Sequence, residues 1–113
     1  MKRIEALIKP HQLEELKAAL YGRGLLPGVT ASELRGYTRG VSERAIYRGA
    51  EQTIDLFPRI KIEIIAHDEL VAPLARAIGR AIGTDRGDCE ILVSEVAAVV
   101  RIRTGEIDEA AIA

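Results

Sequence analysis

The chain has 113 residues, a length typical of one domain, and its 16 basic and 17 acidic residues give a net charge of -1. That balance argues against a general nucleic-acid-binding protein, which needs a clustered positive excess, and a single Phe with no Trp leaves little for base stacking. One cysteine excludes an internal disulfide and favours a reducing compartment.

The N-terminal segment, residues 3–9, is the first predicted strand. It has one strongly apolar face, formed by the alternating residues Ile4, Ala6 and Ile8. The apolar stretch is too short, and with Glu5 too charged, for a signal peptide or a membrane span. We therefore expect a cytoplasmic protein without direct membrane insertion.

An amphipathic helix is predicted over residues 11–23, because its apolar residues fall three or four apart. A weaker strand is predicted over residues 29–35. Residues 36–55 then follow neither the helical nor the strand period. A loop of roughly twenty residues inside so small a domain is unusual, and such loops are usually functional or disordered.

The second half of the chain repeats the order strand, helix, strand. Residues 59–66 alternate isoleucines with charged residues, which predicts the clearest strand. Asp68 is the expected N-cap of the following helix. The apolar stripe of that helix is Leu70, Leu74, Ile78 and Ile82. Short strands are predicted at residues 91–93 and 99–103, before a polar tail over residues 104–113.

Two strand-helix-strand units in a single domain, residues 1–113, predict an α+β ferredoxin-like plait. Both helices cover the same face of the sheet in that architecture. The other face, which carries Leu7, is then open and partly apolar, and this indicates self-association.

Two arginines, Arg101 and Arg103, are the first candidates for a ligand site. In a strand, residues two apart project to the same side, so both guanidiniums would face one ligand. Paired planar cations suit phosphate oxygens, although a solvated edge strand is the commoner explanation of such a pair taken alone. The glycine of Gly87-Asp88-Cys89 lets backbone N–H groups approach an anion, although an ordinary turn explains that segment as well.

The long loop offers candidate partner contacts at Tyr47, Arg48 and Glu51, because Tyr and Arg are frequent at protein interfaces. A solvated segment without a partner is the alternative explanation.

Catalysis has little support, and we expect no enzyme and no metal site. His11 and His67 lie far apart and lack the spacing of metal ligands. Glu90 beside Cys89 disfavours a nucleophilic thiolate. The sequence contains neither a nucleophile elbow nor a Walker-type loop.

Four segments resemble the PII signal-transduction proteins, the nitrogen regulatory P-II family. They are the opening ten residues, Tyr-Arg-Gly-Ala-Glu at 47–51, Lys-Ile-Glu at 61–63, and Arg-Ile-Arg-Thr-Gly-Glu at 101–106. Their order and spacing match the family over essentially the whole chain. The resemblance implies a homotrimer with adenine-nucleotide sites in the clefts between subunits. It also implies that residues 37–55 form an effector loop that docks into a partner protein, often a membrane transporter.

The resemblance also implies roles for individual residues. The adenine end of the site would be formed by Leu7, Thr30, Gly36, Glu63 and Ile65. The ribose would lie near Gly28 and Val29. The phosphates would lie against Gly87, Asp88, Arg101 and Arg103, within reach of Arg39.

The chain departs from the family pattern at the phosphate end and in the loop. Glu90 stands where the family has a phosphate-bridging lysine, so a cation is replaced by an anion. Two unit charges about 4 Å apart interact by a few kcal/mol at an effective dielectric near 20, which predicts weaker ATP binding and a preference for ADP or AMP. Gln52 replaces the modifiable tyrosine, and Gly40 and Arg59 replace residues that support magnesium and 2-oxoglutarate binding.

Three functions remain open from the sequence. The first hypothesis is a divergent PII-like regulator that reads ADP or AMP and is linked to inorganic carbon through bicarbonate. The second is a nitrogen-regulatory protein that senses ATP and 2-oxoglutarate. The third is an orphan ferredoxin-like enzyme or a structural trimer without a nucleotide site.

Overall fold

The computed structural model describes residues 1–22, 28–37, 43–47, 50–54, 56–83 and 90–112. The strands are β1 (Lys2–Ile8), β2 (Thr30–Tyr37), β3 (Glu43–Tyr47), β4 (Ala50–Ile54), β5 (Leu56–Ala66) and β6 (Ile91–Glu95). The α-helices are α1 (Leu13–Gly22) and α2 (Val71–Ile82). Short 3-10 segments are η1 (Pro10–Gln12), η2 (Asp68–Leu70) and η3 (Asp108–Ile112).

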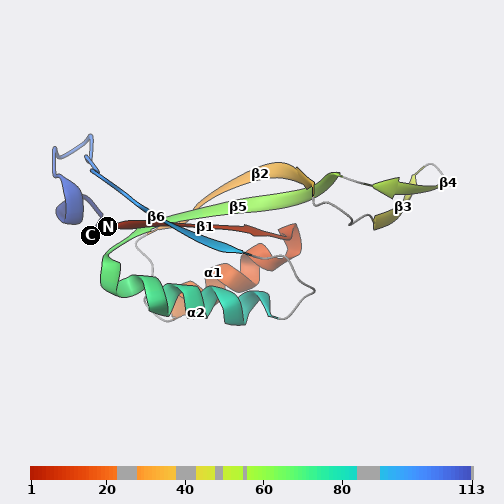
Figure 1. Ribbon diagram of the computed structural model, residues 1–113, viewed down its shortest axis with the longest axis horizontal. Helices are drawn as coiled ribbons and strands as arrows, with labels where there is room; N and C mark the ends of the chain where they lie inside the picture. The colour runs from red at the N-terminus through yellow and green to blue at the C-terminus, as the bar shows by residue number, and fades with distance from the viewer. Residues whose placement is uncertain (23–27, 38–42, 48–49, 55, 84–89, 113) are drawn as a thin grey trace.

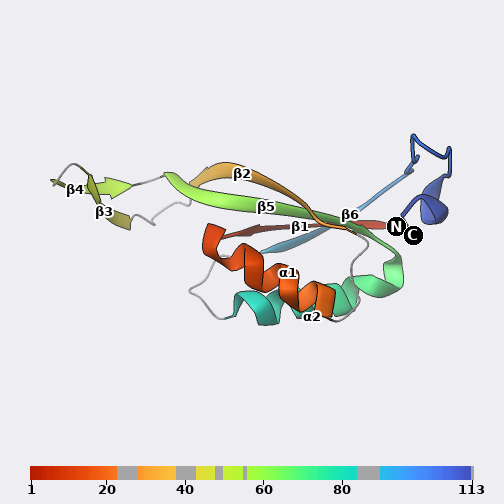
Figure 2. The same ribbon diagram turned by 180° about the vertical axis from the view of Figure 1, so that it is seen from behind.

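Four strands form one antiparallel sheet in the order β2-β5-β1-β6. Helices α1 and α2 lie side by side on one face of this sheet, and no described helix covers the other face (Figures 1 and 2). The strand-helix-strand order therefore occurs twice, which confirms the predicted α+β ferredoxin-like plait. The molecule is elongated, with extents of 54 × 27 × 22 Å, because the β3–β4 hairpin projects beyond the ends of β2 and β5.

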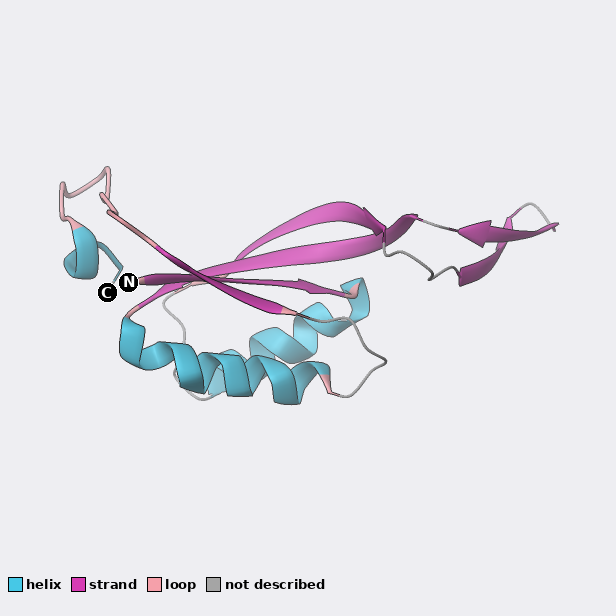
Figure 3. Ribbon diagram, viewed as in Figure 1, coloured by secondary structure: helices cyan, strands magenta, loops and turns pink. Residues whose placement is uncertain are grey.

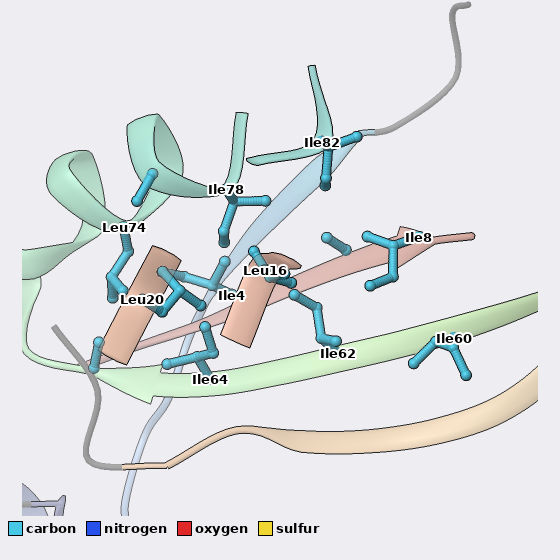
Figure 4. Close-up of a cluster of buried hydrophobic side chains, with 13 residues drawn as sticks. Ile4, Ile8, Leu16, Leu20, Ile60, Ile62, Ile64, Leu74, Ile78 and Ile82 are labelled. Carbon is cyan, nitrogen blue, oxygen red and sulfur yellow. The ribbon is translucent and has the colours of Figure 1, made fainter. Parts of the chain in front are cut away.

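The hydrophobic core lies between the sheet and the two helices (Figure 4). The predicted alternation in β1 and β5 is confirmed, because every second residue of each strand is buried on the helix side. The predicted stripe of α2 is also confirmed: Leu74, Ile78 and Ile82 are buried, and Leu70 packs against them. Each fully buried aliphatic side chain contributes roughly 1.5–3 kcal/mol relative to exposure.

The segment predicted to lack regular structure, residues 36–55, contains a hairpin. Strands β3 and β4 pair antiparallel, with Tyr47 opposite Ala50, and β2 continues as far as Tyr37. The prediction was wrong here because β3 and β4 carry no sustained apolar alternation and do not join the main sheet.

The start of α2 also differs from the prediction, because Asp68 does not cap it. The 3-10 segment η2 precedes the helix, and no side chain caps α2 at Leu70. The Asp68 carboxylate instead accepts a hydrogen bond from the Met1 ammonium at 2.7 Å, with Lys2 Nζ 3.7 Å away. Asp68 therefore links the beginning of β1 to the chain entering α2.

Protonation of Asp68 is expected to weaken this link in acid. The hydrogen bond from the Met1 ammonium, with a further contribution from Lys2, holds the pKa of Asp68 below its ordinary value of 3.8. A folded-state pKa below the unfolded one adds stability above about pH 4, and this contribution is lost as the pH falls through the folded value. Asp68→Asn should therefore lower the free energy of unfolding in urea at neutral pH, and this deficit should be smaller at about pH 2. An equal deficit at both pH values would show that Asp68 acts through packing instead.

Candidate functional site

The open face of the sheet carries a row of paired charges. Glu5 Oε1 accepts a charge-assisted contact from Arg3 Nε at 2.8 Å, and Glu5 Oε2 lies 3.8 Å from Lys61 Nζ. Lys61 Nζ is also 3.3 Å from Glu63 Oε1. The carboxylate of Glu63 is thus held beside a cation at one end of this row.

A pocket of about 370 Å³ lies where β2 begins and β5 approaches its end. The antiparallel register produces this juxtaposition, because Thr30 lies directly opposite Glu63. The pocket is lined by Gly28, Val29, Thr30, Glu63, Ile65, Arg101, Ala111 and Ile112. The first six of these are residues that the sequence predicted for the ligand site. The structure therefore brings half of the twelve predicted ligand residues to one place.

Arg101 enters this pocket from a tight turn, and the strand predicted over residues 99–103 is not present. Within this range the structure has an isolated bridge between Val100 and Ile107 in place of a strand. Gly105 adopts φ +76°, a value that favours glycine, and donates its N–H to the Arg101 carbonyl at 2.8 Å. Because the chain turns here, the expectation that Arg101 and Arg103 share one side of a strand is wrong.

The two arginines have different surroundings. The guanidinium of Arg101 donates from Nη2 to the Ala111 carbonyl at 2.8 Å, and its Nη1 lies 3.6 Å from Glu106 Oε1. Arg103 is exposed within the turn. Arg101 is thus held at the pocket wall by the C-terminal segment, while Arg103 projects into solvent.

Two further predicted residues, Leu7 and Gly36, lie away from this pocket. Leu7 borders a second pocket of about 340 Å³, together with Glu5, Ala6, Leu34, Lys61, Glu90 and Leu92. Gly36 lies opposite Phe57, six residues along β2 from Thr30, which corresponds to roughly 20 Å. Within one chain, Leu7 and Gly36 therefore lie apart from Thr30, Glu63 and Ile65, although the resemblance assigned all five to the adenine end of one site.

The remaining predicted residues fall in the loop or outside the described residues. Tyr47 is in β3 and Glu51 is in β4 of the projecting hairpin. Four predicted residues lie outside the described part of the chain: Arg39, Arg48, Gly87 and Asp88.

Sequence reasoning missed Ala111 and Ile112 as pocket residues. Both belong to η3, in a segment that was predicted to be a polar tail. The available signal was weak, because it consists only of small or apolar residues at the end of an otherwise charged segment.

The first pocket combines three kinds of recognition group. Val29 and Ile65 supply apolar surface, Thr30 and Glu63 supply hydrogen-bonding groups, and Arg101 supplies a planar cation. These groups suit a small anion that carries a flat, partly apolar ring. Among the described residues there is no cluster of three potential metal ligands, and no described helix is long and apolar enough to cross a membrane.

Known proteins with similar sequences match nearly the whole chain. The family described as Nitrogen regulatory protein P-II matches residues 1–106. A nitrogen regulatory protein P-II of Azospirillum brasilense is 47% identical over 94% of this chain and 95% of its own length. One from Bradyrhizobium diazoefficiens is 48% identical over the same shares, and nitrogen regulatory protein P-II 1 of Escherichia coli is 43% identical over 99% of this chain and 100% of its own. Because the match covers the ferredoxin-like domain from its first strand through the arginine turn, the chain belongs to the P-II family of regulatory proteins.

Proposed function

We propose that this chain is a nitrogen-regulatory signalling protein that binds an adenine nucleotide and reports its binding state to a partner through the loop at residues 37–55. The pocket that gathers six of the predicted ligand residues carries the nucleotide part of this proposal. The nitrogen-regulatory part is supported by relatives that bear that name and match the chain over nearly its full length. These names favour nitrogen regulation over the bicarbonate-linked hypothesis.

Within the first pocket, each group has a role in nucleotide binding. The apolar side chains of Val29 and Ile65 contact the adenine ring, and Thr30 and Glu63 offer hydrogen bonds to its polar edge. Arg101 contacts the phosphates, where a guanidinium can form two parallel hydrogen bonds. Arg103, exposed in the neighbouring turn, supplies a second cation.

The nucleotide site is completed by a second copy of the chain. Gly36 lies roughly 20 Å along β2 from Thr30, a separation much longer than an adenine ring. Leu7 and Glu90 line the other pocket. If the pocket of one copy that contains Leu7 faces the pocket of a neighbouring copy that contains Thr30, residues of both pockets can contact one ligand. A homotrimer provides such a cleft at each of its three interfaces.

The open sheet face fits this assembly. Leu7 and Leu92 are 44% and 57% exposed, although both lie on strands of the main sheet. Exposed apolar residues grouped around paired charges are typical of a surface that another protein covers. The projecting β3–β4 hairpin remains clear of this face and is available to a partner such as a membrane transporter.

Titration calorimetry with AMP, ADP and ATP, combined with measurement of the mass in solution, tests this function. We expect a trimer that binds ADP and AMP more tightly than ATP, because Glu90 removes a cation from the phosphate end. Tighter ATP binding in the presence of magnesium and 2-oxoglutarate would instead favour a nitrogen-regulatory protein that senses ATP and 2-oxoglutarate. A monomer, or a trimer that binds none of the three nucleotides, would contradict the proposed site.

Replacing the acid at the phosphate end should reverse the nucleotide preference. Glu90→Lys restores a cation, and we expect ATP affinity to rise roughly 10- to 100-fold, with a smaller gain for AMP because it has fewer phosphate charges. Glu15→Lys, on the exposed side of α1, makes the same change in net charge at a distance from both pockets. Equal gains in the two variants would show that only the overall charge matters.

A further inference from the structure

The C-terminal segment η3 forms one wall of the first pocket. Ala111 and Ile112 line the pocket together with residues of β2 and β5. Ala111 is only 8% exposed, whereas its neighbour Ala110 is exposed. Figure 3 shows the segment folded back beside the start of the chain, after the turn that carries the arginines. A segment near the end of the chain thus occupies space next to the residues assigned to the ligand.

The two ends of this segment are held differently. Its beginning is fixed by the backbone, because Asp108 N–H donates to the Val99 carbonyl at 2.8 Å and the Asp108 carboxylate accepts from Val99 N–H at 3.3 Å. Its end is held by the guanidinium of Arg101, through Nη2 and the Ala111 carbonyl. The end can therefore swing away while the beginning stays in place.

The contact between Arg101 and Ala111 uses the donor group that a phosphate would need. A guanidinium that binds a phosphate with two hydrogen bonds presents adjacent N–H groups in one plane. Nη2 is one of these groups, and in this structure it points to the Ala111 carbonyl. Nη1 is likewise near an anion, since Glu106 lies 3.6 Å away. The segment and a nucleotide thus compete for the same side chain.

We propose that residues 110–112, at the end of η3, are an intramolecular competitor of the nucleotide. They must release Arg101 and move away from the pocket before the phosphates can bind, while Asp108 stays in place. This inference rests on the proposed function and names a regulation of the same site. The apparent affinity is then lowered by the fraction of molecules in which the segment is closed. Because coupling is reciprocal, the nucleotide in turn displaces the segment.

A pair of matched variants tests the competition by ADP titration. Ala111→Gln places a larger polar group in the buried position and should open the segment, which raises ADP affinity roughly three- to tenfold. Ala110→Gln makes the same change at the adjacent exposed position and should stay within about twofold of the parent chain. A chain ended after Glu109 removes the competing carbonyl without filling the pocket, and it should show the same gain as Ala111→Gln.

Hydrogen exchange supplies a second readout on the unaltered protein. Adding ADP should speed the exchange of the amides in residues 110–112, because displacement removes their packing, while the Asp108 amide should be unaffected. Slower exchange would overturn the inference, since the segment would then close over the nucleotide. If the parent chain binds ADP, and neither Ala111→Gln nor the chain ended after Glu109 binds it more tightly, the competition is refuted and the proposed function stands. If neither the parent chain nor the variants bind ADP, the proposed function is refuted together with this inference.

Discussion

Replacing Arg101 and Arg103 together by alanine is expected to weaken ADP binding at least about 100-fold. In the proposed site each guanidinium forms charge-assisted hydrogen bonds to phosphate, worth roughly 1.5–3 kcal/mol apiece, and each 1.4 kcal/mol corresponds to about tenfold in affinity. The sheet and the two α-helices should remain intact, because neither residue belongs to these elements or to the buried core. Calorimetric titration measures the affinity, and circular dichroism checks the fold.

The matched control for this variant removes the same two charges from α2. Arg76 and Arg80 are exposed on that helix, on the side of the sheet away from the pocket. The Arg76→Ala, Arg80→Ala chain should bind ADP within about threefold of the parent, because long-range charge effects are screened by salt. If the Arg101, Arg103 variant binds ADP as tightly as this control, the nucleotide site must lie elsewhere.

Ile62→Ala is expected to cost about 2–5 kcal/mol in the free energy of unfolding. Ile62 lies on β5, opposite Ala6 of β1 and Ala31 of β2, and its side chain is completely buried in the core of Figure 4. The small neighbours cannot fill the space that the missing carbons leave. Urea unfolding at one fixed protomer concentration gives the difference, since association would otherwise shift the transition.

Ile102→Ala provides the control for the core variant. The chemical change is identical, but Ile102 is 98% exposed in the arginine turn. Its cost should stay within about 0.5 kcal/mol. A loss comparable with that of Ile62→Ala would place Ile102 in an interface between copies of the chain and would refute burial as the cause of the difference.

The sequence was sufficient to predict the elements that form the core. The strand β5 and the helix α2 each show one strong period, because alternate or every third to fourth residue must face the same apolar interior. Because burial alone causes this apolar period, it can be recognised in the sequence without knowing which elements pack against the strand or helix. The architecture followed from the order of these elements.

The sequence did not predict the elements whose structure does not depend on packing in the core. The hairpin of β3 and β4 is held by pairing between its own two strands, which leaves no apolar period in the sequence. A strand was predicted over residues 99–103, but the chain turns there and Gly105 allows the backbone to reverse. Local turn geometry decided the structure of that segment.

Only part of the candidate site was predicted, because most of its residues carry no local sequence pattern. Five residues of the first pocket were named only because their types and order resemble a family, and Arg101 alone was also marked by a local pattern, its spacing from Arg103. The contribution of Ala111 could not be predicted, since its position depends on one side-chain to backbone contact with Arg101. A contact of this kind leaves no spacing or composition signal.

The long ribbon formed by β2 and β5 has a mechanical consequence. Eight consecutive residue pairs join the two strands, from Thr30 opposite Glu63 to Tyr37 opposite Leu56. The first of these pairs borders the pocket, and the last lies at the base of the projecting hairpin (Figure 1). If a ligand changes the twist of β2 and β5 at the pocket, the pairing of the two strands carries that change to the base of the hairpin.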